Sequence, residues 1–169
     1  MSKQMSKTNR IGKIVAAATK LPEGLRATLL STIFGRVVPL VGTAGIRYEL
    51  VTANKVICSI KNRRPVQNHI NGVHAAAMAL LAETATGFVV GMNVPDDRIM
   101  LIKSLHVDYK RPTKGDMRAT ATLNDAEREL IRSTEKGELM VTVSVTDESG
   151  QEPIQCQMLW AWLPKKKSS

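Results

Sequence analysis

The stretch NHINGVHAAAMALLAETATG, residues 68–87, contains one acidic side chain, Glu83, in a nearly apolar, alanine-rich run. The run has no internal proline and is too long for a typical strand, so the pattern predicts a helix, which we place at 71–90. Small residues spaced by three or four positions share one helical face with Glu83: Gly72, Ala76, Ala79 and Gly87. That face leaves room for another backbone or a ligand to approach Glu83.

The composition favours a single folded domain with a sizeable core. The chain has 169 residues, of which 43% are hydrophobic, so it is long enough to bury a core and too apolar for wholesale disorder. Residues 72–94 have some of the hydropathy of a membrane-spanning segment. A central glutamate is costly in a bilayer and alanine contributes little, so we predict no membrane span.

The cysteines and histidines give no sign of a disulfide or a metal site. Cys58 and Cys156 are isolated and form no CxxC pair, which is typical of a reducing compartment and predicts a cytoplasmic protein. His69, His74 and His106 lack the spacing of metal ligands. The sequence also has no Walker, GxGxxG or GxSxG motif, so we expect neither a metal nor a cofactor.

The chain is basic, with a net charge of +9 and a pI of about 9.8, which suggests acidic partners. Part of this charge lies at the two ends, which we interpret as solvated tails: Lys3, Lys7, Arg10 and Lys13, and Lys165, Lys166 and Lys167. Aromatic residues make up only 4% of the chain, and no finger, helix-turn-helix or RNA-recognition motif occurs. We therefore do not expect a nucleic-acid partner.

Helical spacing of apolar residues recurs at 10–19 and 23–35, with LPEG at 21–24 between the two runs. The two predicted helices belong to a basic N-terminal segment, 1–44. This segment either packs on the rest of the domain or attaches to a membrane surface. The residues at 37–45 are expected to form a connector.

Period-two alternation predicts strands on both sides of the long helix. One or two strands are expected at 46–62, and antiparallel strands follow the helix at 98–111, 117–123, 139–147 and 155–164. A helix that is apolar almost all round must be buried on most sides. We therefore predict an α+β protein in which a curved antiparallel sheet wraps around one long central helix. A second copy of the chain would cover the side of the helix that the sheet leaves exposed.

Two motifs follow one another along the chain. The first is Asn68, then His74 at the start of the long helix, then Glu83 on that helix. The second is HVDYKRPTKGDMRATATL at 106–123, in which a strand ends at a proline and a glycine turn leads into a strand of small residues. In these motifs the chain resembles the hotdog-fold acyl-thioesterase superfamily over residues 45–163. The similarity is to phenylacetate-pathway-type thioesterases and to a related group of uncharacterised hotdog proteins.

The resemblance implies a hotdog domain at 45–164, preceded by extra N-terminal helices and followed by a basic tail at 165–169. It also implies an acyl-thioester substrate, and a site in which the acid and the asparagine come from opposite subunits. Two departures matter. Many such enzymes have His-Gly-Gly where this chain has His74-Ala75-Ala76, and the added methyl groups would narrow the site or shift the carbonyl-binding amide. Phenylacetate-type enzymes carry aspartate in place of Glu83.

Thioester hydrolysis needs a donor that polarises the carbonyl, a base or nucleophile, and a pocket for the acyl chain. The start of a helix offers free N–H groups and a positive dipole end, which suit a developing oxyanion. We therefore expect the backbone amides of Val73, Ala75 and Ala76 to bind it. Glu83 is the expected base or nucleophile, and an apolar groove should raise its pKa.

Other candidate residues surround this core. Asn68 is expected to orient water or the carbonyl, His74 is a further candidate for catalysis, and the substrate would lie against Gly72 and Ala79. Each of the polar side chains also has a structural interpretation. Asn68 would cap the loop, His74 would hold loop backbone at the helix start, and Glu83 would form a buried ion pair with a lysine or arginine.

Two further clusters admit two interpretations each. Lys110, Arg111 and Lys114 lie at the end of a predicted strand. Arg111 and Lys114 would bind the phosphates of coenzyme A, or the cluster is a solvated turn. Trp160 and Trp162 share one strand face, which is more typical of sheet packing than of a substrate wall.

The sequence thus predicts a cytoplasmic homodimer or homotetramer that hydrolyses acyl-thioesters, with acyl-CoA as the expected substrate. The alternative is a non-catalytic hotdog protein that binds acyl-CoA or acyl-carrier protein. The isolated Glu83 favours the enzyme, and the alanines after His74 favour the binding protein.

Overall fold

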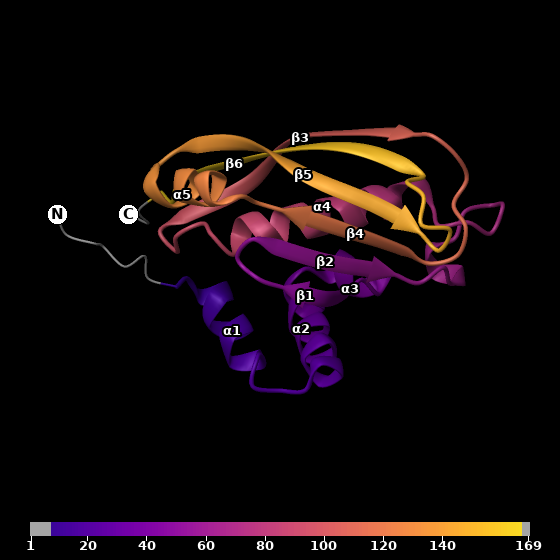
Figure 1. Cartoon of the computed structure of the whole chain (residues 1–169), viewed down its shortest axis with the longest axis horizontal. Coiled ribbons are helices and arrows are strands. Elements are labelled where there is room, and N and C mark those ends of the chain that lie inside the picture. Colours follow the sequence, from indigo (N-terminus) through magenta and orange to yellow (C-terminus); the bar gives the residue numbers. More distant parts are fainter. Residues whose placement is uncertain (1–7, 167–169) are drawn as a thin grey trace.

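A six-stranded antiparallel sheet forms the body of the molecule, and helix α4 (Ala75–Gly91) lies against one face of it (Figure 1). The computed structural model describes residues 8–166. Across the sheet the strand order is β1-β2-β4-β5-β6-β3, with the bounds β1 (Arg47–Val51), β2 (Lys55–Ile60), β3 (Arg98–Tyr109), β4 (Met117–Thr122), β5 (Gly137–Asp147) and β6 (Ile154–Pro164). The predicted architecture, a curved antiparallel sheet with one long helix against it, is confirmed.

Alternating side chains give the sheet a buried face against α4. In β4 the buried residues Met117, Ala119 and Ala121 alternate with more exposed ones, and in β2 the buried positions are Val56, Cys58 and Ile60. Both strands pack on α4. The small side chains of β4 let the helix approach the sheet closely, because alanine adds only one carbon beyond the backbone.

Helix α4 is buried on most sides, as its composition predicts, but it begins later than expected. The sequence placed its start at residue 71, whereas the first helical residue is Ala75. His74 is the N-cap, and its ring Nδ1 accepts a hydrogen bond from the Ala76 amide at 3.1 Å. Gly72 therefore lies in the loop before the helix and not on the helical stripe with Glu83.

Residues 8–44 of the N-terminal segment pack on the domain, which was the first of its two interpretations. The two predicted helices are present as α1 (Arg10–Ala18) and α2 (Glu23–Val37). Residues 37–45, expected to be a connector, contain a third helix, α3 (Pro39–Ala44), which begins at a proline and is followed by a left-handed Gly45. A proline is well suited to the first turn of a helix, so the six-residue helix starts there.

Aromatic rings join α2 to the core. Phe34 of α2 packs on Tyr48 of β1 and on Phe88 of α4, with ring centroids 5.5 Å and 4.4 Å apart. Tyr48 and Phe88 complete the cluster at 4.7 Å. Such edge and tilted contacts stabilise beyond the area they bury. The N-terminal helices are therefore part of the same core as the sheet.

A helix was missed in the region assigned to strands. Helix α5 (Asp125–Ser133) lies between β4 and β5. Its start carries a capping box in which Asn124 Oδ1 accepts from the Glu127 amide and the Glu127 carboxylate accepts from the Asn124 amide. This spacing of an N-cap asparagine and a glutamate three residues later is a start signal that the sequence does contain.

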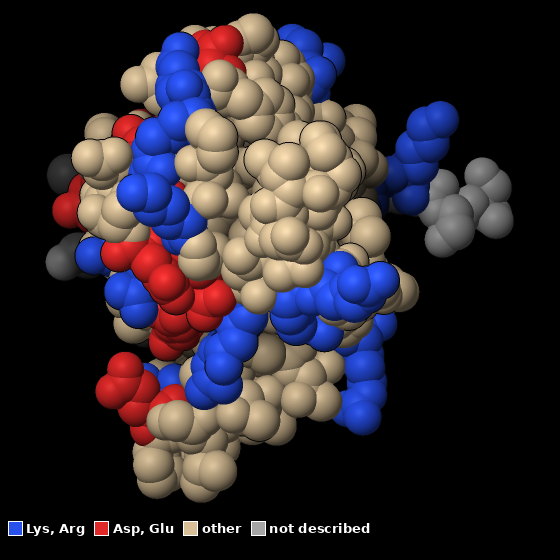
Figure 2. Space-filling model, turned by 90° about the vertical axis from the view of Figure 1, so that its right-hand side faces the viewer, with Lys and Arg blue, Asp and Glu red and all other residues tan. Residues whose placement is uncertain are grey.

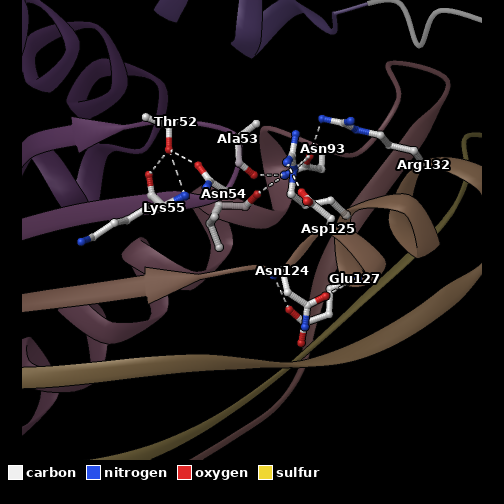
Figure 3. Close-up of polar contacts among 11 residues, drawn as sticks. Thr52, Ala53, Asn54, Lys55, Asn93, Asn124, Asp125, Glu127 and Arg132 are labelled. Atoms are coloured by element: carbon white, nitrogen blue, oxygen red, sulfur yellow. Dashed lines mark hydrogen bonds and ion pairs between the residues drawn. The ribbon is translucent and has the colours of Figure 1, made fainter.

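Asn93 links three separate elements just beyond the end of α4 (Figure 3). Its Nδ2 donates to the carbonyls of Ala53 at 2.6 Å and Val89 at 2.9 Å, and its Oδ1 accepts from the Arg132 guanidinium at 2.7 Å. The side chain is buried, so these bonds satisfy groups that would otherwise be desolvated without partners. They fix the β1–β2 hairpin and α5 against the end of α4.

Within residues 8–166 no helix is both long enough and apolar enough to cross a bilayer. The cysteines Cys58 and Cys156 are free thiols. The predicted solvated tails fall partly outside the described residues, which exclude Lys3, Lys7 and Lys167.

Candidate functional site

Glu83 lines a cavity between α4, the N-terminal helices and the sheet. The cavity has a volume of about 220 Å³. Apart from Glu83 and Thr84 its walls are apolar or aromatic, with contributions from α1, α2, α3, β1, β3 and β6: Ile11, Phe34, Val37, Val38, Val41, Tyr48, Gly87, Phe88, Gly91, Met100 and Trp160. Predominantly apolar walls with a few polar groups are the usual make-up of a small-molecule site.

Of the small residues that the sequence placed on one stripe with Glu83, only Gly87 lines this cavity. Gly87 and Gly91 follow Glu83 at intervals of four residues along α4, and all three line the cavity. The absence of side chains at the two glycines lets the cavity walls pack closely on the helix, because a Cβ on Gly87 would meet Trp160 and one on Gly91 would meet Met100 and Ile11. Ala79, also expected on this stripe, is half-buried and does not line the cavity.

The Glu83 carboxylate is half-buried and has no ion-pair or hydrogen-bond partner within residues 8–166. The structural interpretation of Glu83 as half of a buried salt bridge therefore finds no support among the described residues. Burial raises the pKa of Glu83 above its ordinary value, because the charged form loses hydration in the apolar cavity. A carboxyl with a raised pKa is suited to proton transfer near neutral pH.

Two hydroxyl groups near Glu83 were not predicted. Tyr48 lines the cavity, and burial, followed by electrostatic effects of the nearby Cys58 and Glu83, raises the pKa of Tyr48, so its phenol stays protonated. Thr84 Oγ1 is buried and has no hydrogen-bond partner among the described residues. A buried hydroxyl normally finds a partner, and a free one beside a cavity is available to a ligand. The one feature of the sequence that could have indicated Tyr48 is its inward-facing position in the alternating pattern of a strand.

The helix start is less open than expected. Of the three amides predicted to bind an oxyanion, that of Val73 donates to Thr113 Oγ1 at 3.1 Å and that of Ala76 donates to His74 Nδ1 at 3.1 Å. Both are thus engaged within the chain because the loop residues cap the helix. Ala75 is the one amide of the predicted three that has no partner among the described residues.

The side chain of Asn68 and the backbone of His74 hold the loop before α4. Asn68 Oδ1 accepts from the amides of Ile70 and Gly72, both at 3.0 Å, and the His74 amide donates to the Val66 carbonyl at 2.8 Å. These contacts match the structural interpretations of both residues. They leave Asn68 Nδ2 and His74 Nε2 without partners in the described part of the chain, so each side chain retains one group for a ligand.

A second cavity of about 270 Å³ lies at the helix start. It is lined by residues of α3, of the loop after β2 and of the first turns of α4: Leu40, Thr43, Ala44, Pro65, Val66, Gln67, His74, Ala76, Ala77 and Leu80. Glu83 does not line it. From Ala75 to Glu83 the helix rises about 12 Å, at 1.5 Å per residue. One chain therefore does not bring Glu83 together with Asn68 and His74.

Arg111 is engaged in a buried ion pair. Its guanidinium donates to both carboxylate oxygens of Asp147, at 2.9 and 3.0 Å, and the Asp147 side chain is fully buried. Burial alone would raise the pKa of Asp147, but hydrogen bonds from Arg111, from Ser149 and from the Lys114 amide outweigh it and hold the pKa well below its ordinary value. These contacts use Arg111 within the protein, whereas the Lys114 side chain is exposed.

The two tryptophans pack against the core, as expected. Trp160 donates its indole N–H to Thr86 Oγ1 of α4 at 2.9 Å, and Trp162 donates to the Thr134 carbonyl at 3.1 Å. Trp160 also forms part of the wall of the Glu83 cavity, a role that the sequence analysis had considered less typical.

A family model identifies the family of the chain, and solved structures show its fold. The family model described as a domain of unknown function, DUF4442, matches residues 26–163. A structure from Pseudomonas aeruginosa, described as a protein of unknown function and "Probable Thioesterase", is 23% identical with a TM-score of 0.74, over 86% of this chain and 97% of that one.

Two further solved structures are similar. A thioesterase family protein from Silicibacter pomeroyi is 13% identical with a TM-score of 0.64, over 80% of this chain and 96% of that one. A thioesterase from Haemophilus influenzae is 12% identical with a TM-score of 0.58, over 74% and 82%. No curated protein matches the sequence. At these identities the structures establish the fold, and the predicted hotdog fold is confirmed.

Proposed function

We propose that this chain, which belongs to the DUF4442 family, hydrolyses acyl-thioesters, with acyl-CoA as the substrate class. The observation that carries the proposal is the unpaired, half-buried carboxylate of Glu83 in an apolar cavity of about 220 Å³. An unpaired carboxylate in such a place costs stability, so a role in chemistry accounts for it better than a structural role does. The cavity supplies the apolar surface that an acyl chain requires.

The reaction assigns a distinct task to each group. Glu83 accepts a proton from water as the water oxygen attacks the thioester carbonyl, which forms a tetrahedral oxyanion. The Ala75 amide and the dipole of α4 are suited to stabilise that oxyanion. The carbon–sulfur bond then breaks, and the leaving thiolate takes the proton from Glu83. The Tyr48 and Thr84 hydroxyls are available as further hydrogen-bond donors to the acyl carbonyl.

The two halves of this site come from two copies of the chain. Within one chain Glu83 and the helix start lie in separate cavities. A two-fold dimer can bring Glu83 of one copy to Asn68, His74 and the Ala75 amide of the other. This arrangement is the one implied by the resemblance to hotdog thioesterases, and it assigns Asn68 Nδ2 to the substrate carbonyl or to water.

The test replaces Glu83 with glutamine. Glu83→Gln keeps the size of the side chain and removes the base, so turnover of acyl-CoA should fall by roughly 10²–10⁴-fold, the usual range for general acid–base catalysis. Glu83→Asp keeps a carboxylate and should retain part of the activity. The matched control is Glu135→Gln at an exposed surface position, which should leave turnover unchanged. Wild-type turnover in a well-folded Glu83→Gln protein would refute the assignment.

A second candidate function is binding of acyl-CoA or acyl-carrier protein without hydrolysis. It is favoured by the helix start, where the amides of Val73 and Ala76 are engaged within the chain and alanines replace the two glycines. A hydrolysis screen of the wild-type protein across acyl-CoA chain lengths separates the two. Saturable binding with no release of coenzyme A at any chain length would favour the binding protein.

A further inference from the structure

A groove with cationic walls lies on the other side of α2 and α3 from the Glu83 cavity. Its volume is about 510 Å³. It runs between the helices and the β1–β2 hairpin, and its walls are glycines, hydroxyl residues, one isoleucine and three cationic side chains: Thr28, Ser31, Thr32, Gly35, Arg36, Gly42, Gly45, Ile46, Arg47, Ser59 and Lys61. None of its described lining residues is acidic. We call this the Arg36 groove.

The three cations come from separate elements and converge on one space. Arg36 belongs to the last turn of α2, Arg47 begins β1, and Lys61 follows the end of β2. All three are exposed, and none of them forms an ion pair within residues 8–166. Converging like charges repel one another, so an anion that binds among them removes that repulsion and adds attraction.

The nearby groups leave the cations available. Arg47 makes one long hydrogen bond, 3.5 Å to the Gly24 carbonyl, and the neighbouring carboxylate of Glu49 is paired with Arg118. The hydroxyls of Thr28, Ser31 and Thr32 donate to carbonyls one turn back in α2. Recognition in the groove would therefore depend chiefly on the cationic side chains, because three of its four hydroxyl groups already donate within α2.

A fourth cation stands at the edge of the groove. The Arg63 guanidinium donates to the Thr43 carbonyl at 3.4 Å and passes over Gly45, where a Cβ would lie 2.1 Å from Arg63 Nη2. Figure 2, which looks at the end of the molecule where α4 begins, shows Lys and Arg side chains above and below a protruding uncharged surface, whereas Asp and Glu gather to one side.

We propose that the Arg36 groove binds the phosphate-bearing nucleotide end of acyl-CoA. This inference rests on the proposed function and adds a location for the part of the substrate that carries the negative charge. Phosphate groups are strong acceptors for guanidinium and ammonium donors, and several cations without carboxylate partners fit a ligand with several phosphates. The proposal places the phosphate site in the Arg36 groove and not at Arg111, whose guanidinium is already paired with Asp147.

The first experiment measures binding without any reaction. The probes are adenosine 3′,5′-bisphosphate, coenzyme A and inorganic pyrophosphate, titrated by calorimetry at low and physiological salt. The groove variant is Arg36→Gln/Arg47→Gln/Lys61→Gln, and the matched control Lys13→Gln/Lys20→Gln/Lys55→Gln loses the same net charge at exposed positions outside the groove. We expect the groove variant to bind the bisphosphate and coenzyme A about tenfold or more weakly than the wild type, and the control to bind nearly as the wild type does.

Three outcomes of this titration would overturn the proposal. Equal loss in the two triple variants would show that net charge alone attracts the anion. Pyrophosphate binding as tight as that of the bisphosphate would mean that the groove takes phosphate groups without the nucleoside. Wild-type protein that binds no probe at low salt would leave no site to explain. If the groove variant has a lowered melting temperature, Lys61→Gln alone takes its place, with Lys55→Gln on the same strand region as its control.

The second experiment separates this proposal from the proposed function. For acyl-CoA hydrolysis the groove variant should raise KM and leave kcat nearly unchanged, because the nucleotide end is bound equally in the ground and transition states. For S-acyl-pantetheine, which lacks the nucleotide, the variant should match the wild type. If the wild type hydrolyses neither substrate, the proposed function fails while the titration still decides the groove. If KM for acyl-CoA is unchanged while hydrolysis proceeds, the groove assignment alone is wrong.

Discussion

The half-buried carboxylate of Glu83 lowers the stability of the folded protein, and the size of this effect depends on pH. Because burial raises the pKa of Glu83, the folded protein holds a proton that the unfolded chain has already released above about pH 4.3, the ordinary value for glutamate. The folded state is thus favoured by this group below the unfolded pKa, and the advantage is lost as pH rises through the folded pKa. At neutral pH the unpaired charge is a net penalty.

Glu83→Gln should therefore stabilise the protein at neutral pH and not in acid. The free energy of unfolding of the variant should exceed that of the wild type at pH 8, and the difference should shrink as pH falls towards 4. Urea unfolding at a series of pH values measures it, with the exposed Glu135→Gln as control. A loss of stability in Glu83→Gln would instead indicate that the carboxylate has a structural partner, for example in the partner copy.

Arg111 illustrates the opposite case, in which a charge is buried with its partner. Arg111→Ala would leave the Asp147 carboxylate buried and unpaired, and breaking a buried pair in this way costs about 3–5 kcal/mol. Since the pKa of Asp147 is lowered in the folded state, its stabilising contribution is present above the unfolded pKa of about 3.9 and is lost as pH falls through the folded value.

Arg111→Ala should hence be much less stable than the wild type at pH 7. The difference between their free energies of unfolding should become smaller in strong acid. Denaturant unfolding at pH 7 and pH 3 tests this directly, and Arg111→Lys, which keeps the charge without the two-pronged geometry, should lie in between. A stable Arg111→Ala protein with a raised KM for acyl-CoA would restore the phosphate-binding interpretation of Arg111 made from the sequence.

At the scale of elements, the close approach of Trp160 in β6 to α4 requires a glycine at position 87. A Cβ on Gly87 would lie 2.7 Å from two ring carbons of Trp160, and the ring is held by its hydrogen bond to Thr86. At Gly91 the nearest atoms, 3.2 and 3.3 Å away, are the flexible ends of Met100 and Ile11. Flexible ends can move a few tenths of an ångström, whereas the fixed indole cannot.

Gly87→Ala should accordingly lower the free energy of unfolding by about 1–3 kcal/mol through overpacking, despite the better helix propensity of alanine. Gly91→Ala is the control in the same helix and the same cavity, and it should be neutral or slightly stabilising. Thermal melting of the two variants provides the comparison. Equal melting temperatures would show that Trp160 can reorient and that the contact is softer than its geometry indicates.

The elements that the sequence revealed are those with a long, uniform pattern. The alternation that ends in Trp160 and Trp162 and the alanine-rich run around Glu83 each extend over several turns or pleats, so one face is visible from spacing alone. Helix α3 has six residues, too few for a clear period, and α5, which is as long as the correctly predicted α1, has a largely polar surface with few apolar residues to show a period. The capping pair Asn124 and Glu127 was the one local signal that could have revealed α5.

The site followed the same rule. Glu83 could be identified because a single charged residue in an apolar helix is evident from the sequence alone. The contributions of Phe34, Val41 and Tyr48 to the cavity depend on how distant elements pack, which spacing along the chain does not encode. The engaged amides of Val73 and Ala76 likewise depend on contacts made by the loop and the turn after β3.

At the scale of the whole molecule, strand β3 is an edge strand of the sheet. Within residues 8–166 it pairs with β6 on one side only, through eleven of its twelve residues. Leu105 and Tyr109 are paired in register with the buried Met158 and Ile154, yet they remain 45% and 50% exposed. A long edge with apolar side chains on the side that elsewhere forms the core is a surface that proteins normally cover.

We predict that two chains pair through β3 across a two-fold axis. Light scattering should give about twice the chain mass of 18.5 kDa at micromolar concentration, and Leu105→Glu should return it to the monomer. Met140→Glu, an equally exposed apolar residue on β5, should leave the dimer intact. A monomeric wild type would contradict the assembly and, with it, the shared site.

If the site is shared between the two chains of this dimer, two inactive variants should restore activity to each other in a heterodimer. If Glu83 of one copy works with Asn68 of the other, then Glu83→Gln and Asn68→Ala proteins are each inactive alone, because both of their sites lack a member. A heterodimer of the two variants has one site with both defects and one with none. Co-expression of the two variants, with a different affinity tag on each, should therefore recover hydrolysis in the doubly tagged fraction. The control co-expresses two differently tagged Glu83→Gln chains, which should stay inactive. If the doubly tagged heterodimer is as inactive as its parents, Glu83 and Asn68 act within the same chain or Asn68 serves only to hold its loop.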